Sequence, residues 1–212
     1  MSDLDDNRDA LVLAALRHVP FDGWSRRAMR HAARDAGLDP ALADRAFPYG
    51  AADMVAAFSR LADRRMIAAL EGRDVAAMKV RQRIGAGVRT RLEAWAPHRE
   101  AVRRSIAVLS MPQNTGTVLR CLYDTVDAIW VAAGDSATDW NFYSKRALLA
   151  SVYSATALYW LDDRSEDAVD SWAFLDRRID DVMRIPKIGA RLKNVRNSIF
   201  RPVRICRNFR TY

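Results

Sequence analysis

The segment 139–183 most constrains the fold, because it contains two long amphipathic stretches joined by a short acidic turn. Apolar residues recur at helical spacing over 142–161 and again over 166–183, and neither stretch contains glycine or proline. Ser165 stands where the second helix needs an N-cap. The spacing therefore predicts an αα-hairpin, whose apolar stripes must pack against other helices or against a second subunit.

The rest of the chain shows the same helical periodicity and no convincing run of alternating β-branched residues. Every proline except Pro202 falls between apolar-periodic segments, where helices end. The sequence predicts an all-α protein, a helical bundle of about nine helices followed by a basic amphipathic C-terminal helix. Apart from the hairpin, helices are expected at 6–18, 26–36, 40–47, 51–71, 74–95, 98–109 and 113–133. Gly85 and Gly87, inside one of them, permit close helix approach, leave space for a ligand or mark a kink.

Composition narrows the class of protein. Half of the 212 residues are hydrophobic, so the chain can bury a sizeable core. No apolar run approaches the length of about 18 residues that a membrane-spanning helix needs. The acidic start of the sequence lacks the apolar centre of a signal peptide, and Cys121 and Cys206 are too few for a disulfide framework. We therefore expect a protein of a reducing, cytoplasmic compartment.

The formal net charge of +8 is concentrated at the C-terminal end. Residues 182–212 contain nine basic residues and no acidic one, whereas the rest of the chain has 25 basic and 26 acidic residues. The basic character therefore belongs to a tail at 185–212 and not to the body. For this reason the overall charge is a poor indicator of nucleic-acid binding.

The same tail carries an apolar stripe at intervals of three and four residues. Its members are Ile185, Ile188, Leu192, Val195 and Ile199. A basic amphipathic helix of this kind is typical of segments that lie in the membrane interface. The expected membrane contacts are Ile188, Arg191, Leu192, Val195, Arg196 and Ile199. The alternatives are a helix packed on the body or a partner, and a nucleic-acid-binding tail.

Residues 8–58 resemble the N-terminal domain of TetR-type repressors, with a leading helix, the turn FDGWS and then ARDAGLDPALADRAFPYGAADMVAAF. The resemblance implies a helix-turn-helix part at 1–50. In such a part the third helix reads DNA, yet Asp39 and Asp44 place acids where phosphate contacts would be needed. Gly50 falls where that family usually has a lysine. A DNA-binding regulator that senses a lipophilic ligand is therefore the alternative function, and nucleic acid is not expected as a partner.

No catalytic motif stands out in the sequence. His18, His31 and His98 are isolated, without partners at metal-ligand spacing, and the acidic residues of 162–170 fit a solvated helix start. The sequence also lacks a P-loop, a GxGxxG motif after a strand and a CxxC pair. We expect no metal, no cofactor and no catalytic residue, and thus a protein that is not an enzyme.

The stretch 109–183 resembles the coenzyme Q protein nine family of ubiquinone biosynthesis. The resemblance rests on LSMPQNT, on VDAIWVAAGDSATDWNFYSKRALLASVY and on the run from DDRS to DSWAFLDRRIDDVM. It implies a TetR-like fold without the repressor function, and an accessory protein that binds isoprenoid or quinone lipid in a body at 51–184. It also implies a protein, peripheral on the inner membrane, that presents this lipid to the demethoxyubiquinone hydroxylase. A homodimer through the helices at 142–161 and 166–183 follows by analogy with TetR-type folds.

The same resemblance implies a docking surface for the hydroxylase. This surface maps to Asp127, Trp130, Asp139, Phe142, Tyr143 and Arg146. From the residues alone, aromatic side chains among charges at a helix start indicate either a partner surface or a hydrophobic staple.

The resemblance also implies a lipid pocket between the helices of the body. Its expected wall consists of Val88, Leu92, Trp95, Leu109, Leu122, Tyr123, Val126, Val152 and Tyr153. Each of these residues also fits ordinary core packing, which the sequence does not separate from a pocket wall.

Overall fold

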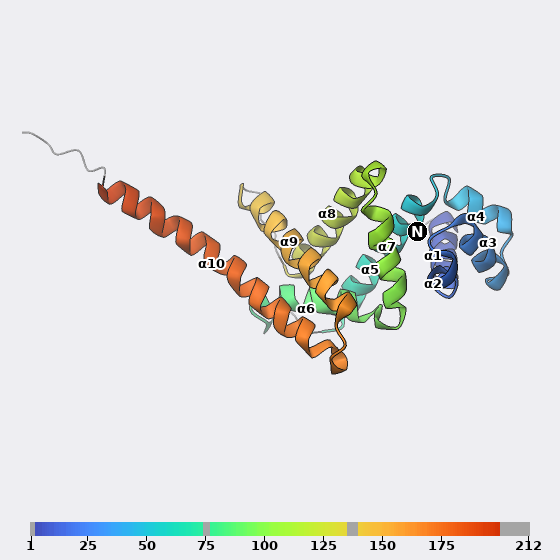
Figure 1. The fold of residues 1–212 in the computed structure, drawn as a ribbon. Coiled ribbons are helices and arrows are strands. Elements are labelled where there is room, and N and C mark those ends of the chain that lie inside the picture. The colour runs from blue at the N-terminus through green and yellow to red at the C-terminus, as the bar shows by residue number, and fades with distance from the viewer. Residues whose placement is uncertain (1–2, 74–76, 135–139, 200–212) are drawn as a thin grey trace, which may run out of the picture.

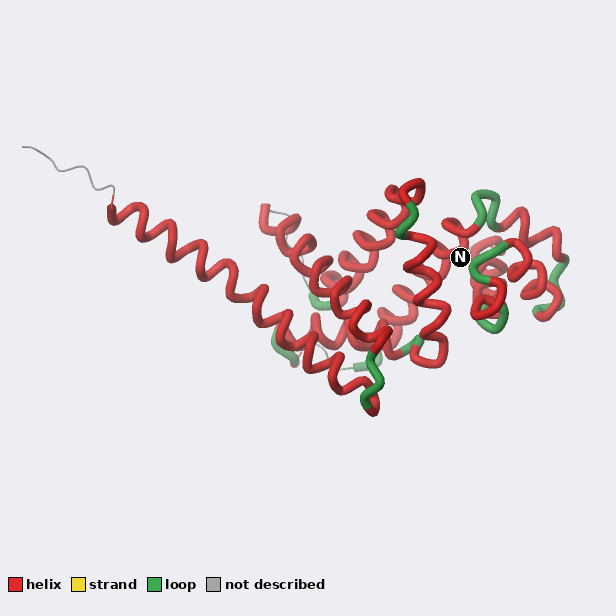
Figure 2. The backbone as a smooth tube through the Cα atoms, in the orientation of Figure 1, coloured by secondary structure: helices red, strands yellow, loops and turns green. Residues whose placement is uncertain are grey.

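The computed structural model describes residues 3–73, 77–134 and 140–199, and places them in helices and connecting loops (Figure 2). Ten α-helices, α1 to α10, cover this part of the chain, which contains no strand. The all-α fold expected from the sequence is thus confirmed. Figure 1 shows a small N-terminal group of helices beside a larger body, with α10 extending away from both.

The N-terminal group contains four helices, two of which are capped by short polar side chains. Ser25 accepts a hydrogen bond from the Ala28 N–H at 3.1 Å, and Asp39 accepts one from the Ala41 N–H at 2.9 Å. These helices are α1 (Asp3–Ala15), α2 (Val19–Asp22), α3 (Arg26–Asp35) and α4 (Pro40–Ala46). The sequence predicted a turn at α2, where Pro20 instead occupies the first turn of a short helix, a position that suits proline.

A long central helix, α5 (Ala51–Glu71), has the bounds predicted from the sequence. It connects the N-terminal group to the body by packing against α1 and against α6, α7 and α8. The helices of the body are α6 (Val80–Glu93), α7 (Arg99–Leu109), α8 (Thr115–Ala132), α9 (Trp140–Asp162) and α10 (Val169–Ile199). The first of them begins later than predicted, at the point where the Gln82 side chain accepts a hydrogen bond from the Lys79 N–H at 3.0 Å.

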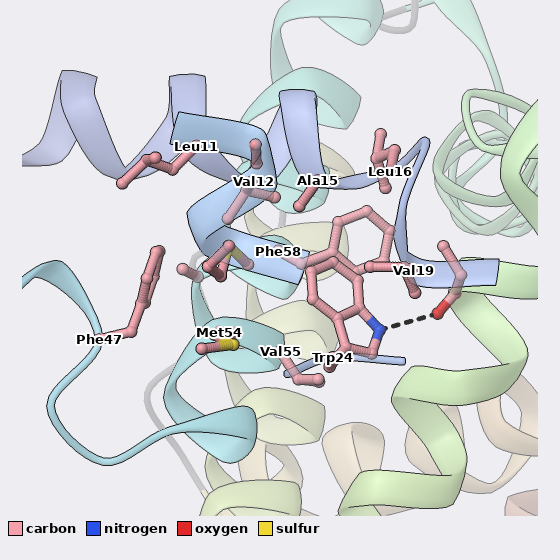
Figure 3. Close-up of a cluster of buried hydrophobic side chains, with 14 of the residues drawn as sticks. Leu11, Val12, Ala15, Leu16, Val19, Trp24, Phe47, Met54, Val55 and Phe58 are labelled. Carbon is pink, nitrogen blue, oxygen red and sulfur yellow. Dashed lines mark hydrogen bonds between the residues drawn. The ribbon is translucent and has the colours of Figure 1, made fainter. Parts of the chain in front are cut away.

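The first hydrophobic core lies between the N-terminal group, α5 and α7 (Figure 3). The indole N–H of Trp24 donates to the Ala101 carbonyl of α7 at 3.1 Å. The Phe58 ring of α5 contacts the rings of Trp24 and Trp95, with centroid distances of 5.2 and 4.7 Å. The N-terminal group is therefore packed directly onto the body.

The second core joins α6, α8, α9 and α10 around the fully buried Trp160. Gly87 allows α6 and α8 to approach closely, because a Cβ atom there would lie 3.0 Å from Ile129 Cγ2. At Gly85 a Cβ atom would lie 3.6 Å from Ile179 Cδ1, which is ordinary van der Waals contact. Of the roles considered for the two glycines, close helix packing thus applies to Gly87.

The carboxylate of Asp163 organises the turn between α9 and α10. It accepts hydrogen bonds from the Ser165 N–H and hydroxyl at 2.8 and 2.6 Å, from the Ser171 N–H at 2.8 Å and from the Ser171 hydroxyl. Burial opposes the charged form, but these hydrogen bonds outweigh it and lower the pKa of Asp163 to about 2. Ser165 also accepts from the Asp170 N–H at 3.1 Å, so it acts at the helix start as predicted, although α10 begins only after a 3₁₀ turn.

α10 is longer than the sequence predicted. It continues through Pro186 to Ile199, whereas the prediction ended one helix at residue 183 and began a separate tail helix. A proline inside a helix costs about 3 kcal/mol, so Pro186 indicates a helix boundary from its local sequence although α10 continues through it. The first part of α10 packs on α6 and α9, and the remainder reaches beyond the body in Figure 1.

Candidate functional site

An apolar cavity of about 240 Å³ lies between α5, α7, α8 and α9. Aliphatic and aromatic side chains form most of its wall: Val55, Phe58, Val102, Ile106, Leu109, Val118, Leu122, Ala157 and Leu158. The hydroxyls of Ser105, Ser110 and Ser154 interrupt this apolar surface. Because all four helices contribute, the cavity depends on how the body packs and belongs to no single motif.

Polar groups gather at one part of the wall, around the guanidinium of Arg91. Its Nε donates to Asp63 Oδ1 at 2.7 Å, and its terminal nitrogens donate to Ser59 Oγ at 3.0 Å, Thr125 Oγ1 at 3.1 Å and the Tyr153 hydroxyl. These bonds compensate the cost of burying the ion pair. Burial also raises the pKa of Tyr153, which keeps its phenol neutral at physiological pH.

A second, more polar hollow of about 450 Å³ adjoins the apolar cavity, and both are lined by Ser59 and Cys121. Arg60 and Arg120 line the polar hollow together with acidic side chains. Burial raises the pKa of the Cys121 thiol, so this side chain is not a reactive thiolate at neutral pH. An apolar space beside a polar one matches the chemistry of an amphiphile.

The residues predicted to line a lipid pocket fall into two groups in the structure, those that line the apolar cavity and those that do not. Leu109, Leu122 and Tyr153 do line the apolar cavity. The others do not line this cavity: Val88, Leu92, Val126 and Val152 belong to the second core, Trp95 belongs to the first, and Tyr123 is 47% exposed on α8. Their role in lipid binding stays a prediction. A wall residue and a core residue occupy the same apolar face of a helix, so spacing does not distinguish them.

The prediction also missed the part that α5 plays in the cavity. Val55 and Phe58 of α5 line it, although the expected wall came only from later helices. The apolar periodicity of α5 was visible in the sequence, but it gave no indication that part of this face remains uncovered. Which faces leave space between them depends on how the helices pack.

Four of the residues predicted to dock the hydroxylase are described, and they lie on α8 and α9 in different environments: Asp127, Trp130, Tyr143 and Arg146. The Arg146 guanidinium donates twice to Asp127 Oδ1, at 2.7 and 2.5 Å, and so ties α9 to α8. Trp130 is only 8% exposed in the second core, and its indole N–H donates to the Lys145 carbonyl at 3.4 Å. Tyr143 is 68% exposed and could meet a partner directly. Trp130 and Arg146 are therefore buried residues that hold α8 and α9 together.

Other predicted site residues lie outside the described part of the structure. These are Asp139 and the side chain of Phe142. The predicted membrane contacts lie on the C-terminal part of α10, where the backbone is helical and the side chains are likewise not described: Ile188, Arg191, Leu192, Val195, Arg196 and Ile199. Their roles stay predictions. None of the described helices is long and apolar enough to cross a membrane.

α4, which would read DNA in a repressor, carries an acid that engages the basic residues of α3. Asp44 accepts hydrogen bonds from Arg30 at 2.8 and 3.1 Å and from Arg26 at 3.3 Å. The hydrogen bond from Arg30 outweighs partial desolvation and lowers the pKa of Asp44. These two arginines are thus already paired with a carboxylate, which weakens their attraction for phosphate.

Two histidines that look isolated in the sequence lie side by side in the fold. The ring centroids of His18 and His31 are 5.3 Å apart, and Asp22 lies beside both. The prediction that these histidines are isolated was wrong, because α2 and α3 fold back on each other. A signal was present in the sequence: His18 precedes Asp22, and His31 precedes Asp35, by four residues, which places each pair on one helix face. His98 lies elsewhere, in the 3₁₀ turn before α7.

The fold defines the class: an all-helical protein with a TetR-like fold. It matches the crystal structure of a TetR transcriptional regulator from Nitrosomonas europaea with a TM-score of 0.67, over 84% of this chain and 98% of that one. The two sequences are 20% identical, so this likeness concerns the fold alone.

Sequence comparison then gives the family. The COQ9 family model matches residues 115–186. The mitochondrial ubiquinone biosynthesis protein COQ9 of Rattus norvegicus is 33% identical and that of Homo sapiens 31% identical, each over 191 residues that make up 87% of this chain. The chain belongs to the COQ9 family, as the resemblance of 109–183 indicated. It spans 61% and 60% of the length of these two relatives.

Proposed function

We propose that this chain is a non-catalytic accessory protein of ubiquinone biosynthesis, which binds an isoprenoid or quinone lipid and presents it to the demethoxyubiquinone hydroxylase. The observation that carries this proposal is the apolar cavity, with its mostly aliphatic wall and the polar cluster around Arg91. Pockets for apolar small molecules have this composition. The names of the rat and human relatives, which refer to ubiquinone biosynthesis, point to the same pathway.

The volume of the cavity limits how much of a lipid it holds. At about 240 Å³ it is smaller than ligand pockets usually are, at about 300–1,000 Å³. A long polyprenyl chain therefore does not fit inside. In our proposal the cavity takes one end of the lipid, while the remainder of the chain stays in a bilayer.

The polar cluster around Arg91 favours binding of the ring end of the lipid in the cavity. The Tyr153 hydroxyl oxygen accepts a hydrogen bond from Arg91, which leaves its own proton to donate to an oxygen of the ligand. Because burial raises the pKa of Tyr153, this group remains a donor at physiological pH. Quinone and phenol rings carry suitable oxygens, and the aliphatic wall beside them suits the first isoprenoid units.

Presentation to an enzyme requires a docking surface and a route to the membrane. Tyr143 provides an exposed aromatic side chain, and the Asp127–Arg146 pair fixes α8 against α9. We place the hydroxylase there, together with Asp139 and Phe142. The basic amphipathic end of the chain would hold the protein peripherally on the cytoplasmic face of the inner membrane.

A homodimer through α9 and α10 also belongs to the proposal. Large apolar side chains are exposed on both helices: Leu158 and Tyr159 on α9, and Val169 and Met183 on α10. Exposed apolar surface of this kind is typical of interaction sites.

The lipid proposal is tested by closing the cavity. Ser154 lines it, whereas Ser151 lies on the same helix and is exposed, so Ser154→Phe and Ser151→Phe form a matched pair. Lipids extracted from the purified proteins are identified by mass spectrometry. We expect isoprenoid or quinone lipid with the wild type and Ser151→Phe, and at least a several-fold loss with Ser154→Phe. Equal lipid in both variants, or none in the wild type, would contradict the proposal.

The pathway is tested separately, in cells that lack the protein. We expect demethoxyubiquinone to accumulate while ubiquinone falls. A normal quinone profile would favour the regulator, the alternative that the Asp44–Arg30 pair weighs against. A mobility-shift assay then decides, because a regulator binds its operator tightly and selectively at physiological salt.

A further inference from the structure

The N-terminal group brings together two pairs of histidine and aspartate. His18 and Asp22 lie four residues apart at the start and end of α2, and His31 and Asp35 lie four residues apart on α3. Each pair occupies one face of its helical segment, and the two faces meet. Neither the cavity nor the docking surface uses these residues, so this cluster is independent of the proposed function.

The contacts run crosswise between the pairs. His18 Nε2 lies 2.7 Å from Asp35 Oδ2, which is a hydrogen bond. His31 Nδ1 lies 3.9 Å from Asp22 Oδ2, which is too long for one. The two imidazole rings are 5.3 Å apart and nearly perpendicular, at 81°. One ligand atom from each of His18, Asp22 and His31 lies within 4.8 Å of the others.

This set of donors matches the coordination chemistry of zinc. Ligand atoms bound to a tetrahedral zinc ion lie about 3.4 Å apart, as bond lengths of about 2.0–2.1 Å require. The three side chains are partly exposed, and their ligand atoms need to approach by at most about 1.4 Å to reach that spacing. Arg27 Nε lies 3.5 Å from Asp22 Oδ1, but the Arg27 side chain is 74% exposed and free to swing away.

The hydrogen bond between His18 and Asp35 resembles one in the outer shell of a zinc site. A histidine that binds a metal commonly donates its other ring N–H to a carboxylate, which fixes the tautomer and the orientation of the ring. Asp35 stands in that relation to His18, because it contacts Nε2 and leaves Nδ1 for a metal.

We propose that His18, Asp22 and His31 bind Zn²⁺, with Asp35 as the residue that positions His18. Three protein ligands leave a fourth position to water. The ion would fasten the junction of α1 and α2 to α3, and so hold the N-terminal group together.

The proposal is tested with the full chain, which is expressed without a polyhistidine tag. A chelator first removes any bound metal. Zn²⁺ binding is measured by calorimetry, and Co²⁺, whose visible absorption reports its coordination, serves as a second probe. We expect one site per chain and a thermal midpoint that rises with Zn²⁺ concentration. Asp35→Asn should weaken binding about 10–100-fold, the usual effect of removing an outer-shell partner.

The control is His98→Ala, which removes a histidine outside the cluster. Binding that persists in this variant and is lost in His18→Ala and His31→Ala supports the site. Asp22→Asn, which is nearly isosteric, must also lose binding, and it decides the matter if an alanine variant fails to fold. Absence of saturable binding by the wild type, or equal binding by wild type and cluster variants, overturns the proposal.

Discussion

Asp63 and Arg91 form an ion pair beside the apolar cavity, with Arg91 Nε 2.7 Å from Asp63 Oδ1 and each side chain only 10% exposed. Burial by itself would lower the pKa of Arg91, but its contacts with Tyr153 and Asp63 outweigh burial and raise it. The pair joins α5 to α6, and Thr125 of α8 donates to the same carboxylate at 3.0 Å. The helices α5, α6 and α8 are therefore joined by one cluster of polar side chains beside the cavity.

Breaking this pair should destabilise the protein strongly. Asp63→Leu or Arg91→Met alone leaves one buried charge without its partner, and we expect each to lower the free energy of unfolding by about 3–5 kcal/mol. The double variant removes both charges and should recover most of that loss. Urea unfolding of the four proteins measures the coupling. Additive losses in the double variant would show that the two side chains act independently.

The two glycines of α6 should respond oppositely to the same substitution. Gly85→Ala gains helix propensity of up to about 1 kcal/mol, because its Cβ meets Ile179 at ordinary distance. Gly87→Ala forces the buried Ile129 to move, at a cost of about 1–3 kcal/mol that offsets this gain. Thermal unfolding should rank Gly85→Ala above wild type and Gly87→Ala below it. The reverse order would contradict the close approach of α6 and α8.

Trp130 and Tyr143 should separate stability from partner binding. Trp130→Ala leaves a void in the second core and should cost about 3–5 kcal/mol of stability. Tyr143→Ala removes an exposed ring, so it should leave the thermal midpoint nearly unchanged and weaken binding of the hydroxylase. Calorimetric titration with the purified hydroxylase measures the second effect. If Tyr143→Ala loses stability in proportion to binding, the hydrophobic staple is the better interpretation.

Asp163 should make the free energy of unfolding depend on pH in the acidic range. Its pKa is about 2 in the folded state and 3.8 without the fold, so its stabilising effect is complete above pH 4 and is lost as the pH falls towards 2. After allowance for solvent screening, the effect is about 1 kcal/mol. Asp163→Asn should remove this part of the acid sensitivity in urea unfolding between pH 4 and pH 2. The neighbouring Asp162→Asn is the control and should behave as wild type.

Removal of residues 185–212 should separate membrane binding from folding. The described contacts of α10 with α6 and α9 involve Trp172, Leu175 and Ile179, which remain in the truncated protein. We expect its thermal midpoint to be retained and its flotation with anionic liposomes to be lost. In the full chain, Arg191→Gln with Arg196→Gln should weaken flotation about 30-fold, at about 1 kcal/mol per charge. Undiminished flotation of the truncated protein would refute a membrane role for this segment.

The sequence predicted helices well because their signals are local. α5 has its predicted bounds, and the predicted cap Ser165 accepts a backbone hydrogen bond from Asp170 at the start of α10. Apolar periodicity and capping depend on neighbours a few residues away, so one chain suffices to detect them. α10 is an exception to such local prediction. Pro186 indicates a helix boundary from its neighbours in the sequence, but the helix continues through it.

The site was harder to predict, because its features arise from helices that are far apart in the chain. Val88 and Leu122 have similar apolar surroundings in the sequence, yet one fills the core and the other faces the cavity. The crosswise contacts of His18 with Asp35 and of His31 with Asp22 appear only when α2 meets α3. Such juxtapositions require the tertiary arrangement.

The contact between Trp24 and Ala101 has a consequence for how the molecule unfolds. Phe58 and Trp95 are covered by the N-terminal helices, and α5 passes through both parts of the protein. Loss of residues 1–50 would expose this aromatic surface to water. The chain should therefore melt in one cooperative transition, with the N-terminal helices and the body losing hydrogen-exchange protection together. The N-terminal helices, which resemble the DNA-binding part of a repressor, therefore shield the first hydrophobic core from water.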